Sequence, residues 1–199
     1  MWPEIRARYA QAELHVIYGF ANWMSGIETS KDEGKRRWVE WIRNLLNQAG
    51  VFNHDRVGQA ELADWYKKSS VWLMPEPFTE TNSITAKEAM AGGCIPICSD
   101  VAALATTVGP ERGIIIPFGD WKKAYQIYKT KEIKDQFLAA TFDFLDHRDR
   151  YRPMLDRNRA EMLRDFSWAA VAKDWHERFF KHHLFPGRAA VGLGAELTL

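Results

Sequence analysis

The sequence predicts an α/β protein, in which one parallel sheet is flanked by helices and followed by a helical C-terminal extension. Short apolar runs alternate with longer amphipathic stretches, which is typical of a parallel sheet wrapped by helices. After Gly119 the strand pattern stops and helical spacing continues alone. With 199 residues and neither an internal repeat nor a linker, the chain has the length of one ordinary domain.

Four short elements are predicted in the first third of the chain. We expect the last of them to be buried through Leu62, Trp65 and Tyr66. The four elements are the end of a helix at 2–9, a strand at 13–18 closed by Gly19, a second strand at 51–54 and a helix at 59–68.

The clearest helix is predicted from Lys31 to Ala49, with Gly50 as its stop. Its apolar residues recur at helical spacing, and we expect this stripe to pack in the core. Arg36, Arg37 and Arg43 should form a solvated face rather than a membrane patch. The stripe consists of Trp38, Trp41, Ile42, Leu45, Leu46 and Ala49.

Short apolar runs and amphipathic stretches alternate most closely between residues 71 and 116. Val71–Met74 is a continuous apolar run, which predicts a central parallel strand covered on both faces. Cys94 and Cys98 bound the next run, and we expect buried, reduced thiols because this spacing is not that of a metal site. The other predicted elements are a loop at 75–82, a helix ending at Gly92-Gly93, strands at 94–98 and 113–116, and a short helix at 101–108.

The C-terminal part is predicted to be helical. Ser167 is a suitable N-cap, and the apolar residues after it recur at helical spacing, which predicts a second core stripe. We assign residues 1–183 to the domain and 184–199 to a flexible tail, because the sequence from Pro186 is Gly-rich and aperiodic. The stripe consists of Trp168, Val171, Ala172, Trp175 and Phe179.

Composition restricts the partners of the chain. Hydrophobic residues make up 46% and charged residues 27%, and the net charge is +1, so nothing in the charge predicts binding to nucleic acid. No apolar run approaches the roughly 20 residues that a membrane span requires. Residues 1–6 lack the apolar core of a signal peptide, and we therefore expect a cytoplasmic protein.

The loop-to-helix segment from Pro75 to Gly93 carries the residues most suited to chemistry. It follows a strand, at the edge where open α/β sheets bind ligands. The helix start, with Thr81, Asn82 and Ser83 as possible caps, offers free backbone N–H groups to a diphosphate. Glu80 can accept hydrogen bonds from sugar hydroxyls. Glu88, roughly 7 Å along the helix from Ser83, can reach a ribose diol.

Purely structural interpretations of the same residues stay open at this point. Thr85-Ala86-Lys87-Glu88 satisfies a capping box, in which Glu88 would cap a helix that starts near Ala86. Glu80 could be an ordinary exposed loop carboxylate, and Arg56 a solvated surface residue.

Glu80-x7-Glu88, followed by Ala-Met-Ala-Gly-Gly-x-x-Pro, resembles the donor-binding motif of retaining GT-B glycosyltransferases, close to glycosyltransferase family 4. Residues 51–57 with Glu61-Leu62-Ala63 resemble the strand, base-contacting loop and following helix of that family. Phe166-Ser167-Trp168 and Trp175 resemble its C-terminal helix. The resemblance extends from Trp2 to Phe180.

The resemblance implies a role for each matching residue. Glu80 would be the catalytic residue and contact the donor sugar, and Glu88 would bind the ribose. The diphosphate would lie on the backbone of Asn82, Ser83 and Ile84, and Thr81 beside them would also belong to the substrate-binding site. The base pocket would be lined by Arg56, Val57 and Gly58. Thr81-Asn82 stands where glycine and an aromatic residue are more usual in the family.

The resemblance also implies a function for the chain. The fold would be a single Rossmann-like domain, the donor half of a GT-B fold without its first strand. The donor would be a UDP- or GDP-linked sugar, with no metal and no further cofactor. Transfer would need an acceptor-binding domain or a separate chain. Two alternatives remain: a non-catalytic nucleotide-sugar-binding or partner-docking module, and part of a sugar-nucleotide epimerase.

One expected feature of the family has no counterpart in the sequence. The family's basic residues that neutralise the leaving diphosphate would fall before Met1. Lys87 and Arg56 are the nearest basic residues, and neither matches the family's positions. We therefore expect this chain alone to be incomplete as an enzyme.

Overall fold

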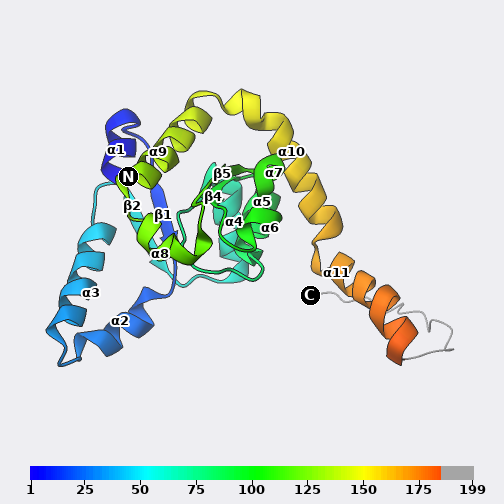
Figure 1. Cartoon of the computed structure of the whole chain (residues 1–199), viewed down its shortest axis with the longest axis horizontal. Coiled ribbons are helices and arrows are strands. Elements are labelled where there is room, and N and C mark those ends of the chain that lie inside the picture. The colour runs from blue at the N-terminus through cyan, green and yellow to red at the C-terminus, as the bar shows by residue number, and fades with distance from the viewer. Residues whose placement is uncertain (185–199) are drawn as a thin grey trace.

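A computed structural model of the chain describes residues 1–184, apart from the side chains of residues 22, 23, 121 and 182–184. It confirms the α/β class, with parallel strand pairs and flanking helices (Figure 1). The strands form two parallel sheets, whereas the sequence predicted one. β1 (Leu14–Ile17) pairs with β2 (Val51–Asp55), and a separate sheet has the order β3-β4-β5.

The first sheet carries a helical hairpin, of which only the second helix was predicted from the sequence. α1 (Trp2–Arg8) precedes β1, and the chain then forms α2 (Phe20–Glu28) and α3 (Glu33–Leu46) before it enters β2. α2 and α3 project from one side of the molecule (Figure 1). α3 begins where Asp32 caps it, its side chain accepting a hydrogen bond from the N–H of Lys35.

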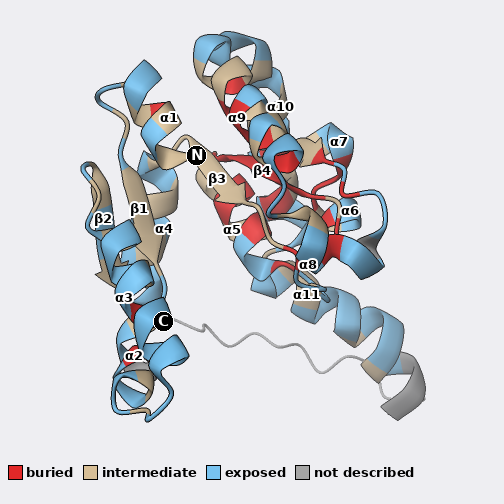
Figure 2. Cartoon of the chain, turned by 60° about the vertical axis from the view of Figure 1, so that its left-hand side comes forward, coloured by how far each residue is buried: buried red, intermediate tan, exposed pale blue. Residues whose placement is uncertain are grey.

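The second sheet consists of β3 (Val71–Met74), β4 (Ile95–Ser99) and β5 (Ile114–Ile116). β4 lies in the middle and each of its residues is buried, whereas β3 lies at an edge and is half-buried. The prediction that β3 is a central strand was therefore wrong. Its buried neighbour β4 is the central strand instead (Figure 2).

Helices connect and cover this second sheet. α5 (Ile84–Gly92) leads from β3 to β4, and the short helices α6 (Leu104–Thr107) and α7 (Gly109–Arg112) lead from β4 to β5. α5 ends as predicted: Gly93 has a φ of 97°, its N–H donates to the carbonyl of Met90 and the N–H of Cys94 donates to that of Ala89. This is a Schellman motif, which a glycine with positive φ permits.

Two helix contacts link the sheets: α1 packs against α9 (Lys131–Asp146), and α4 (Gln59–Lys68), which follows β2, packs against α5. Gly92 of α5 lies so close to Tyr66 of α4 that a Cβ there would be 2.5 Å from the Tyr66 Cβ. The Cys94 thiol donates to the carbonyl of Tyr66 at 3.1 Å. Leu62, Trp65 and Tyr66 are half-buried, so α4 is less deeply packed than predicted.

The C-terminal part is helical, as predicted. α9 supplies Ile133, Phe137 and Phe144 to the core around β4. Ser167 caps α11, its side chain accepting from the N–H of Ala170. The helices are η1 (Trp121–Lys123), α8 (Ala124–Ile127), α9 (Lys131–Asp146), α10 (Arg148–Asp165), α11 (Trp168–Trp175) and a π-helix, η2 (His176–Leu184). Of the predicted tail, residues 185–199 lie outside the described part of the chain.

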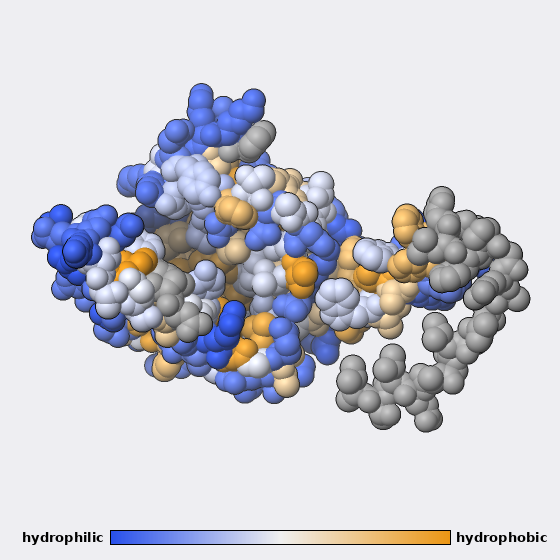
Figure 3. All heavy atoms as spheres, turned by 90° about the horizontal axis from the view of Figure 1, so that it is seen from below, coloured by the Kyte–Doolittle hydropathy of each residue, from blue (hydrophilic) through white to orange (hydrophobic). Residues whose placement is uncertain are grey.

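The predicted core stripes were wrong for their aromatic residues. In α3, Val39 is 1% exposed, whereas Trp38 and Trp41 are 45% and 55% exposed. On α11, Trp168 and Trp175 are exposed as well. Apolar side chains are exposed on the surface of the part of the chain that begins with α11 (Figure 3). None of the described helices combines the length and the apolar character that a membrane span requires.

The prediction for the two cysteines is confirmed. Cys94 and Cys98 are both buried and free. Burial raises the pKa of each thiol to about 12, and the nearby charge of Asp100 adds to the effect at Cys98. Both thiols are therefore protonated at neutral pH and act as small apolar groups of the core.

Replacing Gly92 by alanine should lower the free energy of unfolding by about 1–3 kcal/mol, the usual range for overpacking. The added Cβ would meet the Cβ of Tyr66 and, at 2.9 Å, its backbone carbonyl carbon. Gly26→Ala in α2 is the matched control, because nothing lies within 4 Å of its Cβ. Urea unfolding followed by circular dichroism compares the two variants. Wild-type stability of Gly92→Ala would contradict the close contact of α4 and α5.

Candidate functional site

The loop between β3 and α5 is held by hydrogen bonds from the last residue of β4 and from the segment that follows it. The hydroxyl of Ser99 donates to the carbonyl of Glu76 at 2.7 Å, and the N–H of Ala103 donates to the carbonyl of Glu80 at 3.0 Å. Ser99 is completely buried and Pro77 is buried as well. The loop therefore has a fixed backbone at the carboxyl edge of the sheet.

Ser99 was not predicted from the sequence to hold the loop between β3 and α5. Its one local signal is a hydroxyl at the end of an otherwise apolar buried strand, where a buried polar group needs a partner. Asp100 likewise has a structural role, because its carboxylate accepts from the N–H of Phe118 at 2.8 Å and joins the ends of β4 and β5.

The start of α5 offers backbone donors. Ser83 is the N-cap residue in extended conformation, and no side chain caps the helix there. The first-turn N–H groups, beginning at Ile84, are therefore available to an anion. Ser83 is buried, whereas Thr81 and Asn82 are exposed. The residues predicted to bind the diphosphate thus lie next to one another at the start of α5.

The structure excludes the capping-box interpretation of Glu88. α5 begins at Ile84, two residues earlier than that interpretation requires, so Glu88 lies beyond the first turn. Glu88 is half-buried, and burial raises the pKa of its carboxyl. Its charge, after the larger effect of burial, also raises the pKa of Tyr66. The Glu88 carboxyl is therefore close enough to Tyr66 of α4 for its charge to act on it.

Glu80 lies in the loop on a backbone that is fixed on both sides. Its N–H donates to the carbonyl of Phe78 at 3.0 Å, and its own carbonyl accepts from Ala103. The residue is half-buried rather than fully exposed. A carboxylate on such a fixed backbone loses little freedom when it binds a ligand.

The predicted base-contacting residues follow the other sheet. Asp55, with a φ of 55°, ends β2, and its carboxylate accepts from the N–H of Ala21 at 3.3 Å. Arg56 is exposed, Val57 is half-buried and Gly58 is the N-cap residue of α4. No hydrogen bond or ion pair within residues 1–184 joins these residues to the Glu80–Glu88 segment. They are linked to it through α4 and α5.

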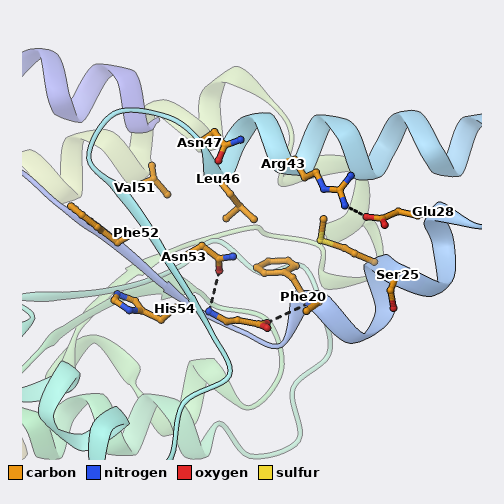
Figure 4. A pocket seen from close by; sticks show the side chains of 13 residues that line it. Phe20, Ser25, Glu28, Arg43, Leu46, Asn47, Val51, Phe52, Asn53 and His54 are labelled. Atoms are coloured by element: carbon orange, nitrogen blue, oxygen red, sulfur yellow. Dashed lines mark hydrogen bonds and ion pairs between the residues drawn. The ribbon is translucent and has the colours of Figure 1, made fainter.

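A groove among the described residues lies elsewhere. It has a volume of about 880 Å³ and runs between α2, α3 and the open edge of β2 (Figure 4). The ion pair of Arg43 with Glu28 lies on one side, and Asn53 and Asp55 lie on the other. None of the predicted site residues lines it. This groove was not predicted from the sequence, because α2 was not predicted.

The parallel strands and flanking helices of the described chain have the fold of a GT-B glycosyltransferase fragment. Residues 3–129 match the family described as Glycosyl transferases group 1, which is more than half of the chain. The chain belongs to this family.

Individual relatives agree with this class. The chain is 28% identical over 127 residues to the D-inositol 3-phosphate glycosyltransferases of Streptomyces scabiei and Streptomyces griseus. These matches cover 62% of this chain and 25% and 24% of the two relatives. The chain thus spans about a quarter of the length of the curated relatives it matches.

A solved structure shows the same fold. The structure of sucrose-phosphate synthase from Thermosynechococcus elongatus matches with a TM-score of 0.56 and 21% sequence identity. The match covers 88% of this chain and 47% of that chain. It therefore extends beyond residue 129 into the C-terminal helices.

Glu88→Gln should raise the free energy of unfolding at neutral pH, because burial disfavours the ionised carboxyl in the folded state. Below the ordinary pKa of 4.5, the carboxyl is protonated in both states and the effect vanishes. As pH rises from there through the raised folded pKa, the wild type loses stability relative to the variant. Unfolding curves from acid to neutral pH measure the difference. A stability difference between the two proteins that does not change with pH would contradict the burial of the Glu88 carboxyl.

Proposed function

We propose that this chain is the donor-binding part of a retaining glycosyltransferase of family 4. It would transfer a hexose from a UDP- or GDP-linked donor to an acceptor held by a second domain or a partner chain. The observation that carries the proposal is the uncapped start of α5 between Glu80 and Glu88, in a chain that belongs to Glycosyl transferases group 1.

Each residue has a physical role in this proposal. The diphosphate lies at the start of α5, where Asn82, Ser83 and Ile84 contribute backbone N–H groups and the helix dipole favours negative charge. Thr81 and Glu80 lie on the sugar side, where the Glu80 carboxylate accepts from sugar hydroxyls. Glu88 accepts from the ribose hydroxyls. No metal and no further cofactor takes part.

The base lies near Arg56, Val57 and Gly58 at the end of β2 in this proposal. Support comes from the position of these residues at the carboxyl edge of their sheet, and from the α4–α5 contact that connects that edge to the start of α5.

Calorimetric titration with UDP and GDP tests the donor site. Glu88→Ala should weaken binding of the preferred nucleotide about tenfold or more, as expected for the loss of hydrogen bonds to a charged group. Glu80→Ala should leave nucleotide binding unchanged and weaken only the nucleotide sugar, because Glu80 contacts the sugar alone. Glu40→Ala, at an exposed position of α3, is the control. Absence of nucleotide binding by the wild-type chain would refute the donor site.

A radiolabelled transfer assay tests whether the chain needs an acceptor-binding partner. We expect no sugar transfer from labelled UDP- or GDP-sugars to simple acceptors by the 199-residue chain alone. Nucleotide binding should nevertheless persist, which separates missing catalysis from missing recognition. Sustained turnover by the chain alone would show that it contains a complete acceptor site.

A further inference from the structure

Lys87 is the fourth residue of α5, one turn after the helix start at which we propose that the diphosphate binds. Its ammonium group donates a hydrogen bond to the side-chain carbonyl of Asn82 and lies 5.0 Å from the centre of the Phe166 ring. Side chains of a helix tilt toward its N-terminus, and the contact with Asn82 shows that the ammonium group reaches the level of the helix start. A cation is thus placed beside free backbone donors.

Lys87 has two uncharged partners, the side chains of Asn82 and Phe166. No carboxylate among the described residues lies within ion-pair distance of its ammonium group, although Glu80 and Glu88 are close in sequence. Five other lysines of the described surface pair with carboxylates: Lys67 with Asp64, Lys123 with Asp120, Lys131 with Asp135, Lys134 with Glu4 and Lys181 with Glu177. Lys68 and Lys129, like Lys87, lie over aromatic rings.

The surroundings of Lys87 favour an anion. The side chain is half-buried, and burial lowers the pKa of its ammonium group. A partly desolvated cation with neutral partners is stabilised more by a nearby negative charge than an exposed cation is, because water screens the attraction less. The amide of Asn82 holds the ammonium group in place without neutralising it.

We infer that Lys87 is a diphosphate-binding residue, which supplies from within α5 the positive charge that a nucleoside diphosphate requires. The inference rests on the proposed donor site and adds to it a residue and a specificity. A nucleoside diphosphate carries more negative charge to the helix start than a monophosphate does. Lys87 therefore contributes most to diphosphates and nothing to nucleosides.

Titration calorimetry of the full chain with UDP, UMP and uridine, and with GDP, GMP and guanosine, tests this inference. Lys87→Met should weaken diphosphate binding about tenfold or more and leave nucleoside binding unchanged. It should also reduce the salt dependence of diphosphate binding, which a merely structural role would not change. Lys87→Arg should restore most of the affinity. Lys67→Met removes a lysine that is paired with Asp64 and is the control.

The outcomes separate the two proposals. If the wild-type chain binds no nucleotide, the donor site fails, and the role of Lys87 fails with it. If the wild type binds UDP or GDP and Lys87→Met binds it with the same affinity and salt dependence, only the role of Lys87 is refuted. A variant with equally weakened nucleoside binding would also refute it, after thermal unfolding has shown that the variant folds.

Discussion

The close contact between α4 and α5 is the constraint on which the candidate site depends. The two sheets share no hydrogen-bonded strand pair within the described chain, so backbone pairing does not fix their relative position. Gly92 lies against the backbone of Tyr66, and the Cys94 thiol donates to the same residue. One helix follows the proposed base loop and the other carries the proposed diphosphate site. The packing of α4 against α5 therefore sets the distance between the proposed base loop and the proposed diphosphate site.

Elements with local signals could be predicted from the sequence. α5 is an example, since its end is encoded by two glycines and its start by a loop of turn residues. α2 was missed because Ser25 and Gly26 lower its helical propensity, and the contact with α3 overrides that preference. The pairing of strands was also missed, because no local pattern states whether β3 has one neighbour or two.

The aromatic residues of α3 show a second limit of sequence patterns. Periodicity correctly placed Trp38, Trp41 and Ile42 on one side of the helix, but it does not show how much of that side a neighbour covers. α3 buries Val39, and the apolar stripe is wider than the surface it packs against. The predicted burial of the stripe is therefore wrong for Trp38, Trp41, Leu45 and Ala49, which are exposed. Ile42 and Leu46 are half-buried, and the buried residue, Val39, was not part of the predicted stripe.

In the candidate site, the motif predicted which residues come together at the start of α5, but it could not predict their environment. The interaction of Lys87 with Phe166 needs α10 to pack on α5, which is a tertiary contact. Adjacent residues of a helix point about 100° apart, so Lys87 and Glu88 face different neighbours. Lys87 contacts Phe166, whereas the charge of Glu88 raises the pKa of Tyr66. In the proposed site, one short helix thereby carries a cation for the diphosphate and a carboxylate for the ribose hydroxyls, and the two side chains form no ion pair among the described residues.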